Sequence, residues 1–317
     1  MSRYVGRYTA TELLSTEFKG TNPLIQNLIY ERDNVLLVGK EKANKSTLAL
    51  QFCCHLTSNQ EPFLGEHEIP KSVDVVYLQA EGKIAQTKSN LANMTRVIPF
   101  NSEKLLFLYY PSIPLNTEVG IKTVMTEIDS WRKPELIVID PLYQTMIGKI
   151  EDQESSSKMT ASLRQLSEHY QCAILLLHHA HRARRDENNN IVEEGDDSIF
   201  GSFVWKAFPE SVLLIEKVRG NKLYRRLSCN TQRMGNVIEE IDLQLIEPSP
   251  FYLDVRGTPP CVDLVYHNLN NQTSMKDLNM ATGKSRQTIT SALNILIGQN
   301  RAVRINPGDN PALWSKR

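Results

Sequence analysis

The sequence has no excess of either charge, because 36 Lys and Arg residues balance 36 Asp and Glu residues over 317 positions. Any surface that binds a polyanion must therefore be local. No apolar run approaches the 18 residues of a membrane-spanning helix, and the N-terminal MSRYVGRYTATELL lacks the apolar core of a signal peptide. We therefore expect a soluble, cytoplasmic protein with no membrane partner.

Cysteine is also scarce, and its spacing excludes two further classes of protein. The five cysteines form no C-x-x-C pair and no disulfide framework; they are Cys53, Cys54, Cys172, Cys229 and Cys261. A zinc-stapled domain and a disulfide-rich secreted domain are both excluded on this basis. Cys53 and Cys172 lie in apolar runs, where we expect buried free thiols.

What the sequence does contain is a regular alternation of apolar runs and helix-like segments. We expect strands in NVLLVG, VDVVYLQAE, KLLFLYY, ELIVID and CAILLLHH, with helices between them. Continuously apolar strands separated by helices indicate a parallel sheet covered on both faces, which is an α/β architecture. The later runs SVLLIEKV, KLYRRLSCNT and EEIDLQLI predict closing strands in antiparallel order.

Two changes in composition divide the chain. The polar, asparagine-rich stretch HRARRDENNNIVEEGDDS predicts a long loop within the first domain. The stretch EPSPFYLDVRGTPPC carries four prolines and predicts a linker. We therefore predict a core over residues 1–247, a linker over 248–262 and a second domain over 263–317. Little sequence precedes the core, so we expect no primase or primase-binding domain.

The stretch LLVGKEKANKSTLALQF approaches the phosphate-loop pattern G-x-x-x-x-G-K-[ST]. Gly39 follows a predicted strand, Lys45 and Ser46 open a predicted helix, and Thr47 would support the turn. Asn44 stands where the pattern has its second glycine, and asparagine tolerates left-handed backbone better than most residues. Such a loop binds phosphate through backbone N–H groups and the helix N-terminus. The alternative is a lysine-rich turn that only mimics the motif.

Polar side chains follow three of the predicted parallel strands, at the edge where open α/β sheets bind ligands. Asp140 ends LIVID, as a Walker-B aspartate does, or it caps the following turn. Glu81 ends VVYLQAE and would act as a general base, or it is simply exposed at a strand end. His178 and His179 end LLLHH, where one would sense a γ-phosphate or both would be structural.

Together these segments resemble the RecA-like ATPases of the RepA and DnaB type, the hexameric replicative helicases, and most closely the RepA-like branch of plasmids and phages. LLVGKEKANKSTLALQF resembles that branch's GKPKxGKSxLAL loop, and LIVIDPLYQTM resembles its LVVIDPL segment. FLGEHEIPKSVDVVYLQAEG and CAILLLHHAHR followed by FGSFVWKAFPESVLLIEK also have counterparts there. The match spans about residues 10 to 230.

The resemblance implies a RecA-like parallel-sheet P-loop ATPase core that uses ATP and Mg²⁺. Gly39 and Asn44 would belong to the nucleotide-binding loop. Lys45 would bind phosphate, and Ser46 would bind both phosphate and Mg²⁺. Glu81 would be the catalytic base, and Asp140 would be the Walker-B acid that holds the metal.

The family also implies assembly, because its active sites lie between subunits of a hexamer. Lys217 and Arg219, in EKVRGN, fit the spacing of the K-x-R pair that reaches the γ-phosphate of a neighbouring subunit; alternatively they end a solvated hairpin. His179, or else His178, would couple the γ-phosphate to the DNA-binding loops. The departure at Asn44 bears on turnover more than on binding, and it leaves a slow or switch-like ATPase open.

Basic residues in the long loop are candidates for contacts with single-stranded DNA. Arg182, Arg184 and Arg185 lie near the predicted active edge and could follow a phosphate backbone. The alternative is a charged loop without a ligand, because DENNN and EEGDD follow directly.

The C-terminal domain has the plan of a winged helix-turn-helix. Ser274 and Asp277 have capping-box spacing, Gly283 ends that helix, and a second helix, KSRQTITSALNILIGQN, precedes a predicted hairpin in RAVRI and ALWSK. The apolar residues of the second helix recur at helical spacing: Ile289, Leu293 and Leu296. Residues 274–317 carry seven Lys or Arg and two Asp, which favours phosphate contacts.

The start of the second helix would then read double-stranded DNA in the major groove. The residues placed there are Lys284, Ser285, Arg286, Gln287 and Thr288. The alternative is a module that binds protein. Taken together, the sequence predicts an ATP-dependent DNA motor, a RepA-like replicative helicase of a plasmid, phage or mobile element. Two alternatives remain: an ATP-switched DNA-binding regulator or loader without unwinding activity, and a structural DNA-binding protein with an inactive nucleotide site.

Overall fold

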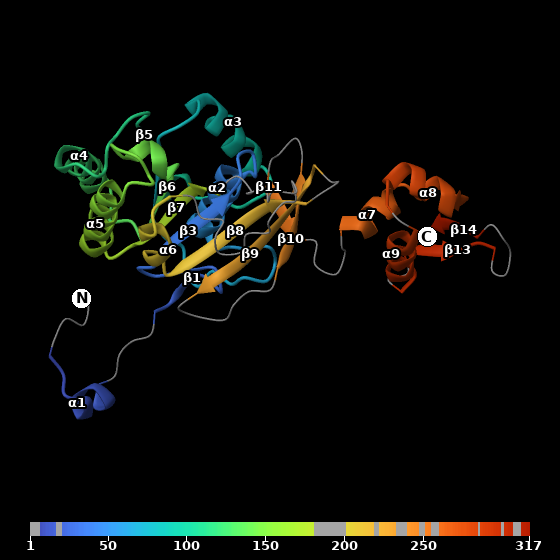
Figure 1. Cartoon of the computed structure of the whole chain (residues 1–317), viewed down its shortest axis with the longest axis horizontal. Helices are drawn as coiled ribbons and strands as arrows, with labels where there is room; N and C mark the ends of the chain where they lie inside the picture. Colours follow the sequence, from blue (N-terminus) through green and yellow to red (C-terminus); the bar gives the residue numbers. More distant parts are fainter. Residues whose placement is uncertain are drawn as a thin grey trace, which may run out of the picture.

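The computed structural model describes residues 7–16, 21–180, 201–218, 222–232, 240–246, 251–254, 260–284, 286–298, 301–306 and 312–317. A large α/β body is followed by a small C-terminal unit, which lies beyond the β10 and β11 labels in Figure 1. The short helix α1 (Ala10–Ser15) has no buried residue and projects from the body near the N-terminus (Figure 1). Within the described residues no helix is long and apolar enough to cross a membrane.

A nine-stranded sheet forms the body, in the order β11-β10-β9-β8-β3-β7-β6-β4-β5. Six of its strands are parallel: β3 (Asn34–Gly39), β4 (Val75–Gln79), β5 (Leu105–Tyr109), β6 (Leu136–Asp140), β7 (Ala173–His179) and β8 (Ser211–Lys217). Most of their residues are buried, because helices cover both faces, and this explains the continuous apolar runs. The predicted parallel α/β sheet is confirmed.

The predicted antiparallel closing strands are confirmed, because β8, β9 (Tyr224–Gln232) and the strand Ile241–Ile246 pair antiparallel in that order. The structure adds two features that the sequence did not predict. The first is that the other edge of β8 pairs parallel to β3. The second is that the expected linker over 248–262 contains β11 (Phe251–Asp254), which pairs with β10 (Ile241–Ile246), and it also contains the start of the next helix. Local composition does not reveal such pairing, because backbone hydrogen bonds to a distant strand decide it.

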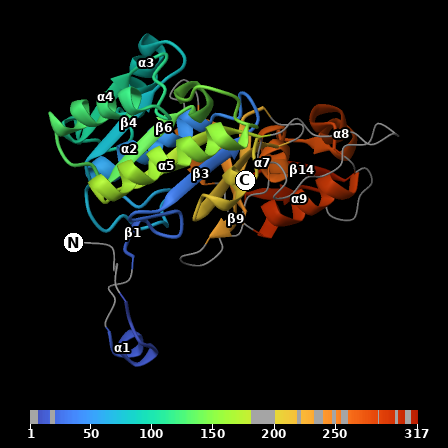
Figure 2. The same ribbon diagram turned by 60° about the vertical axis from the view of Figure 1, so that its left-hand side comes forward.

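Helices cover the two faces of the sheet (Figure 2). On one face α2 (Lys45–Ser58) and α3 (Ile84–Met94) share a hydrophobic cluster with the sheet, and on the other α4 (Glu118–Asp129), α5 (Gln153–Tyr170) and α6 (Val204–Ala207) share a second one. The short elements of the body are β1 (Pro23–Ile25), β2 (Ile29–Tyr30), η1 (Ser102–Lys104) and η2 (Leu142–Thr145).

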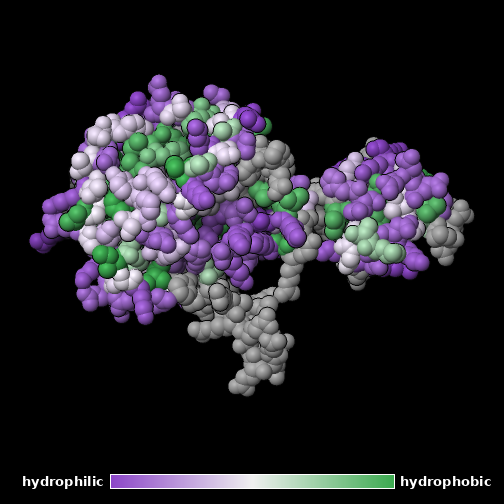
Figure 3. All heavy atoms as spheres, turned by 90° about the horizontal axis from the view of Figure 1, so that it is seen from above, coloured by the Kyte–Doolittle hydropathy of each residue, from purple (hydrophilic) through white to green (hydrophobic). Residues whose placement is uncertain are grey.

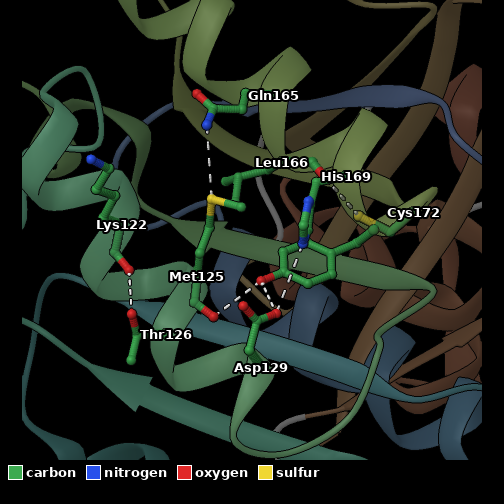
Figure 4. Close-up of polar contacts among 9 residues, drawn as sticks. Lys122, Met125, Thr126, Asp129, Gln165, Leu166, His169 and Cys172 are labelled. Carbon is green, nitrogen blue, oxygen red and sulfur yellow. Dashed lines mark hydrogen bonds and ion pairs between the residues drawn. The ribbon is translucent and has the colours of Figure 1, made fainter.

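A polar network joins α4 to α5 beside this second cluster (Figure 4). The Tyr170 hydroxyl donates to Oδ1 of Asp129 at 2.8 Å and lies 3.1 Å from the backbone oxygen of Met125. The Nε2 atom of His169 lies 3.9 Å from the same carboxylate. One carboxylate on α4 thereby fixes the end of α5, which precedes strand β7.

The C-terminal unit has a hydrophobic core of its own. It contains α7 (Pro260–His267), β12 (Thr273–Ser274), α8 (Met275–Thr282), α9 (Arg286–Gly298), β13 (Ala302–Arg304) and β14 (Leu313–Lys316), with the three strands in the order β12-β14-β13. On the face visible in Figure 3, most of the surface of this unit is hydrophilic, with a few apolar residues scattered over it.

Several predictions for this unit are confirmed. Ser274 and Asp277 form the capping box that opens α8, and Gly283 ends the helix in the left-handed conformation. The three residues of α9 predicted at helical spacing, Ile289, Leu293 and Leu296, are buried. Val262 on α7 and Leu278 on α8 are buried as well. The predicted hairpin exists as β13 and β14. Helix α7 was not predicted.

Candidate nucleotide site

The loop between β3 and α2 has the geometry of an anion cradle. Strand β3 ends at Gly39 and α2 begins at Lys45, so the loop leads directly into a helix N-terminus. Asn44 caps that helix with φ 70° and ψ 31°, the left-handed conformation that glycine adopts most readily and asparagine tolerates. Asn44 therefore supplies the backbone geometry that the missing glycine would have supplied.

The glycine at the start of the loop has a steric requirement. A Cβ atom at Gly39 would lie 2.6 Å from the backbone oxygen of Ile215 on β8 and 3.3 Å from Cβ of Ala43. The close approach of β8 therefore leaves no room for a side chain. Gly39 and His179 are register partners on β3 and β7, so the loop begins beside the end of β7.

Lys45 folds back over its own loop. Its Nζ atom donates to the backbone oxygens of Gly39 at 2.8 Å and Lys40 at 3.3 Å, and the side chain is buried. Burial lowers the pKa of the ammonium group, while the negative charges of Asp140, Glu81 and Glu41 oppose that change. The amine thus lies within electrostatic reach of both predicted catalytic carboxylates.

Asp140 accepts hydrogen bonds from two hydroxyl groups. The Tyr77 hydroxyl on β4 donates to its Oδ2 atom at 2.6 Å, and the Ser46 hydroxyl also bonds to the carboxylate. Burial raises the pKa of Asp140, whereas these hydrogen bonds and the charge of Lys45 lower it. An enclosed carboxylate beside a hydroxyl, facing a phosphate cradle, is a donor set that suits Mg²⁺ bound with a nucleotide.

Glu81 lies two residues beyond the end of β4 and is held from another loop. The Tyr143 hydroxyl donates to its Oε2 atom at 2.8 Å, and Gln79 donates to its backbone oxygen at 2.8 Å. The Tyr143 ring lies 5.3 Å, centroid to centroid, from the ring of His179. Burial and the charge of Lys45 lower the pKa of His179, with opposing contributions from Glu81 and Glu41. Glu81, Tyr143 and His179 therefore form one group at the carboxyl edge.

A cavity of about 280 Å³ is lined by Ser46 and Asp140, the predicted metal ligands, and by residues of α3. Its lining includes Tyr77 and Glu81 beside these two residues. The lining also includes the N-cap of α3, Lys83, and three polar residues of that helix: Gln86, Thr87 and Asn90. The cavity opens beside Ser46 and Asp140, where the β- and γ-phosphates of a nucleotide and their metal would lie if the loop binds them.

A model of a protein family, described as an AAA domain, matches residues 6–185 of the chain. The chain belongs to the AAA domain family. The matched segment contains the loop, the glutamate after β4 and the aspartate at the end of β6. No curated protein sequence matches the chain.

Two solved structures share the fold of this AAA domain protein. One is described as an ATPase domain, with a TM-score of 0.53, 12% identity, and coverage of 72% of this chain and 86% of that one. The other is a DnaB-like replicative helicase described with its interactions with primase, with a TM-score of 0.54, 11% identity, and coverage of 77% and 66%. The body of this chain therefore has the RecA-like P-loop ATPase fold.

Not all of the other predicted core residues of the AAA domain protein lie at this site. Thr47 is buried in the first turn of α2. His178 is 1% exposed and lies against Trp205, with ring centroids 6.1 Å apart, in the core on the opposite face of the sheet, so His179 is the histidine at the site. Lys217 is exposed at the end of β8. Arg182, Arg184, Arg185 and Arg219 lie outside the described residues.

The predicted DNA-binding residues of the C-terminal unit lie just before α9 and in its first turn. Arg286 is exposed at the first position of α9, and Lys284 is partly exposed in the preceding turn, where its backbone oxygen accepts from Asn279 at 2.6 Å. Gln287 and Thr288 belong to α9, but their side chains, like residue Ser285, lie outside the described part of the chain.

Three residues at the site were not found from the sequence. Tyr77 and Tyr143 contact the two carboxylates, and Arg225 on β9 contacts the phosphate loop. Tyr143 could have been noticed because it follows Asp140 by three residues. No local signal marks Arg225, because its contacts depend on the position of β9 in the sheet.

Proposed function

We propose that the chain binds and hydrolyses ATP to act on DNA, as a RepA-like replicative helicase of a plasmid, phage or mobile element. One observation carries the proposal: Lys45, Ser46, Glu81 and Asp140, which come from three strand ends, converge on a single edge of a RecA-like sheet. The chain shares its fold with a solved ATPase domain and with a DnaB-like replicative helicase, which supports an ATP-dependent activity on DNA.

The residues divide the chemistry between binding and proton transfer. Lys45 and the backbone N–H groups of the loop, from Gly39 through Asn44 to Thr47, hold the phosphates. Ser46 and Asp140 would hold Mg²⁺, which neutralises charge on the phosphates when it is bound with ATP. Lys45 now hydrogen-bonds to carbonyl oxygens of its own loop, so it would exchange these acceptors for phosphate oxygens on binding.

Glu81 is placed to orient a water molecule and accept its proton as the water attacks the terminal phosphate. Its carboxylate lines the cavity together with Asp140, which brings the base and the metal-binding residue to the same space. Tyr143 holds the carboxylate in position through its hydroxyl. His179 lies against Tyr143 and would couple the γ-phosphate to the DNA-binding loops.

The DNA-acting part of the proposal concerns residues around this edge and the C-terminal unit. Six copies would form a ring, with Lys217 and Arg219 of one copy reaching the nucleotide of the next. Arg182, Arg184 and Arg185 would follow single-stranded DNA in the centre. The described residues of the C-terminal unit form three helices and a three-stranded sheet in the chain order α7-β12-α8-α9-β13-β14. On this basis the unit would act as a winged helix that binds double-stranded DNA.

The recognition residues proposed in that unit are Lys284, Arg286, Gln287 and Thr288. We propose the domain division of the sequence with one adjustment: β11 extends the core to residue 254, so the connection to the C-terminal domain is the segment 255–259.

A second function is favoured by the contact of Asn44, the residue that replaces the usual second glycine of the loop. Asn44 accepts a hydrogen bond from Arg225 on β9. This contact restrains the loop directly before Lys45, which favours binding of nucleotide over rapid turnover. An ATP-switched regulator or loader, which assembles on DNA without unwinding it, would use the same site at a low rate.

The deciding experiment measures ATP hydrolysis with and without single-stranded DNA. The samples are the full chain and its Lys45→Ala, Glu81→Gln and Arg226→Gln variants; Arg226 is the control because it pairs with Asp242 and Glu240 away from the loop. DNA-stimulated turnover that is lost in the first two variants and kept in the third supports the motor. ATP binding without turnover supports the switch, and DNA binding that is indifferent to ATP rejects both.

A further inference from the structure

A buried arginine reaches the phosphate loop from a strand of the antiparallel edge. Arg225 lies on β9 and is 4% exposed. Its Nη2 atom donates to Oδ1 of Asn44 at 2.6 Å, and its Nε atom donates to the backbone oxygen of Ala43 at 3.3 Å. One guanidinium group therefore holds two consecutive residues of the loop, directly before Lys45.

The orientation of Arg225 follows from the alternation of side chains along β9. Leu227 and Cys229, at two-residue spacing, belong to the hydrophobic cluster on the α2 face of the sheet. Arg225 is in the same phase, so its side chain points to the face on which α2 and the phosphate loop lie. Lys217 is its register partner on β8, at the same edge of the sheet.

Among the described residues Arg225 has four acceptors, and all of them are neutral. Its Nη1 atom donates to the backbone oxygens of Lys222 and Tyr224, both at 2.8 Å, and the remaining donors reach Ala43 and Asn44. Within the described part of the chain, no carboxylate forms an ion pair with it. A buried cation with only neutral partners is costly to desolvate, and an anion close by reduces that cost. The adjoining loop is the place where a polyphosphate would bind.

We propose that Arg225 is a positioning residue for nucleotide binding, which acts through Asn44. It fixes the loop in the anion-binding conformation, and its charge becomes matched when a nucleoside triphosphate enters the cradle. This inference rests on the proposed function of the same site. Asn44 is then a partner of Arg225, because it combines tolerance of the left-handed conformation with a side-chain acceptor that glycine lacks.

This assignment makes a prediction that a purely conformational role of Asn44 does not make. Glycine adopts the left-handed conformation at less cost than asparagine. If Asn44 served only the backbone, Asn44→Gly would leave nucleotide binding unchanged or improve it. If Asn44 serves as the acceptor for Arg225, the same change weakens binding, since a buried N–H donor loses its partner.

The neighbouring arginine provides a matched control. Arg226 is next to Arg225 on β9, but its side chain points to the other face, where it bonds to Asp242 at 2.9 Å and to Glu240 at 2.9 Å. Replacing either residue by Gln removes one positive charge from the same strand. Only Arg225→Gln removes contacts to the loop.

The experiment titrates the full-length chain with a fluorescent N-methylanthraniloyl derivative of ATP and measures its Kd, with thermal melts to check folding. We expect Arg225→Gln to raise the Kd about tenfold, and Asn44→Gly to raise it by about threefold or more. Arg225→Lys keeps the charge without the planar fork and should fall between wild type and Arg225→Gln. Arg226→Gln should stay within about twofold of wild type, because a surface substitution away from the site has little effect.

The double variant Asn44→Gly with Arg225→Gln tests the coupling directly. We expect it to bind no more weakly than Arg225→Gln alone, since both changes remove the same hydrogen bond. Independent, additive losses would overturn the inference, and so would an unchanged or lower Kd in Asn44→Gly. If Arg225→Gln does not fold, the Asn44→Gly and Arg225→Lys titrations decide the matter in the same way.

Failure of this inference can be distinguished from failure of the proposed function. ATP binding that Lys45→Ala abolishes but Arg225→Gln leaves intact overturns the positioning role alone. A wild-type chain that does not bind the probe at all overturns the proposed nucleotide site together with the role of Arg225.

Discussion

The Tyr143 hydroxyl donates a hydrogen bond of 2.8 Å to the carboxylate of Glu81, although 62 residues separate the two in the sequence. The pairing exists because β4 and β6 are neighbours in the sheet, so the segments that follow both strands emerge at the same edge. Since the Tyr143 ring also packs near His179, the contact joins three strand ends.

Removal of that hydroxyl should slow hydrolysis without weakening nucleotide binding. Tyr143→Phe keeps the ring near His179 but releases the Glu81 carboxylate, which must be oriented for proton transfer. We expect kcat to fall by about three- to tenfold, with KM for ATP within about twofold. Steady-state kinetics beside Glu81→Gln measures this. A change in KM alone would mean that Tyr143 serves binding instead.

Substitution of the first loop glycine should damage the fold as well as the site. In Gly39→Ala the new Cβ would meet the Ile215 backbone oxygen at 2.6 Å, so β3 and β8 would have to separate. We expect a loss of about 1–3 kcal/mol in the free energy of unfolding. Urea denaturation measures it. Lys40→Ala is the comparison, because it truncates an exposed side chain in the same loop and should change stability by less than about 0.5 kcal/mol.

A buried carboxylate directly before β3, at the amino ends of the parallel strands, should make the free energy of unfolding depend on pH. Burial, aided by the charge of Glu210, raises the pKa of Asp33 to about 7, and its Oδ2 atom has no hydrogen-bond partner among the residues that the structure describes. The folded chain thus binds this proton more tightly than the unfolded chain does. The stabilisation is fully present below about pH 4 and is lost as the pH rises through 7.

Asp33→Asn removes that dependence, because the amide carries no charge in either state. The variant should match wild type near pH 4 and exceed its melting temperature above pH 7, where the free-energy difference is a few kcal/mol at most. Melting curves between pH 4 and 9 test this. Glu210→Gln removes the charge that helps to raise the pKa of Asp33, so the loss of stability with rising pH should begin at a lower pH than in wild type. A difference in melting temperature between Asp33→Asn and wild type that is the same at all pH values contradicts the prediction.

The network between α4 and α5 should contribute measurably to stability. Tyr170→Phe removes the hydrogen bond to Asp129 and the contact with the Met125 backbone oxygen, while the buried ring remains. We expect a loss of about 1 kcal/mol in the free energy of unfolding. Tyr110→Phe is the matched control, because its bond to Glu127 is exposed and its loss should cost less than about 0.5 kcal/mol. Equal effects in the two variants would show that the partly buried position of the Tyr170 hydroxyl does not matter.

Local sequence determined the parts of this protein that depend on neighbouring residues. The apolar strands, the turn from Gly39 into the helix at Lys45, and the capping box at Ser274 follow from patterns a few residues long. The ends of strands could be located for the same reason, and this pointed to Asp140 and His179. Glu81 was expected as the last residue of its strand, but β4 ends at Gln79 and Glu81 follows two residues later.

Only the tertiary structure decided which of these strand ends meet. The parallel pairing of β8 with β3, and the addition of β11 to the sheet, depend on hydrogen bonds between segments distant in sequence. Arg225 reaches Asn44 across 181 residues because β9 lies beside β8. An arginine in a strand carries no local mark of such a partner, since its side chain finds one only after the sheet has assembled.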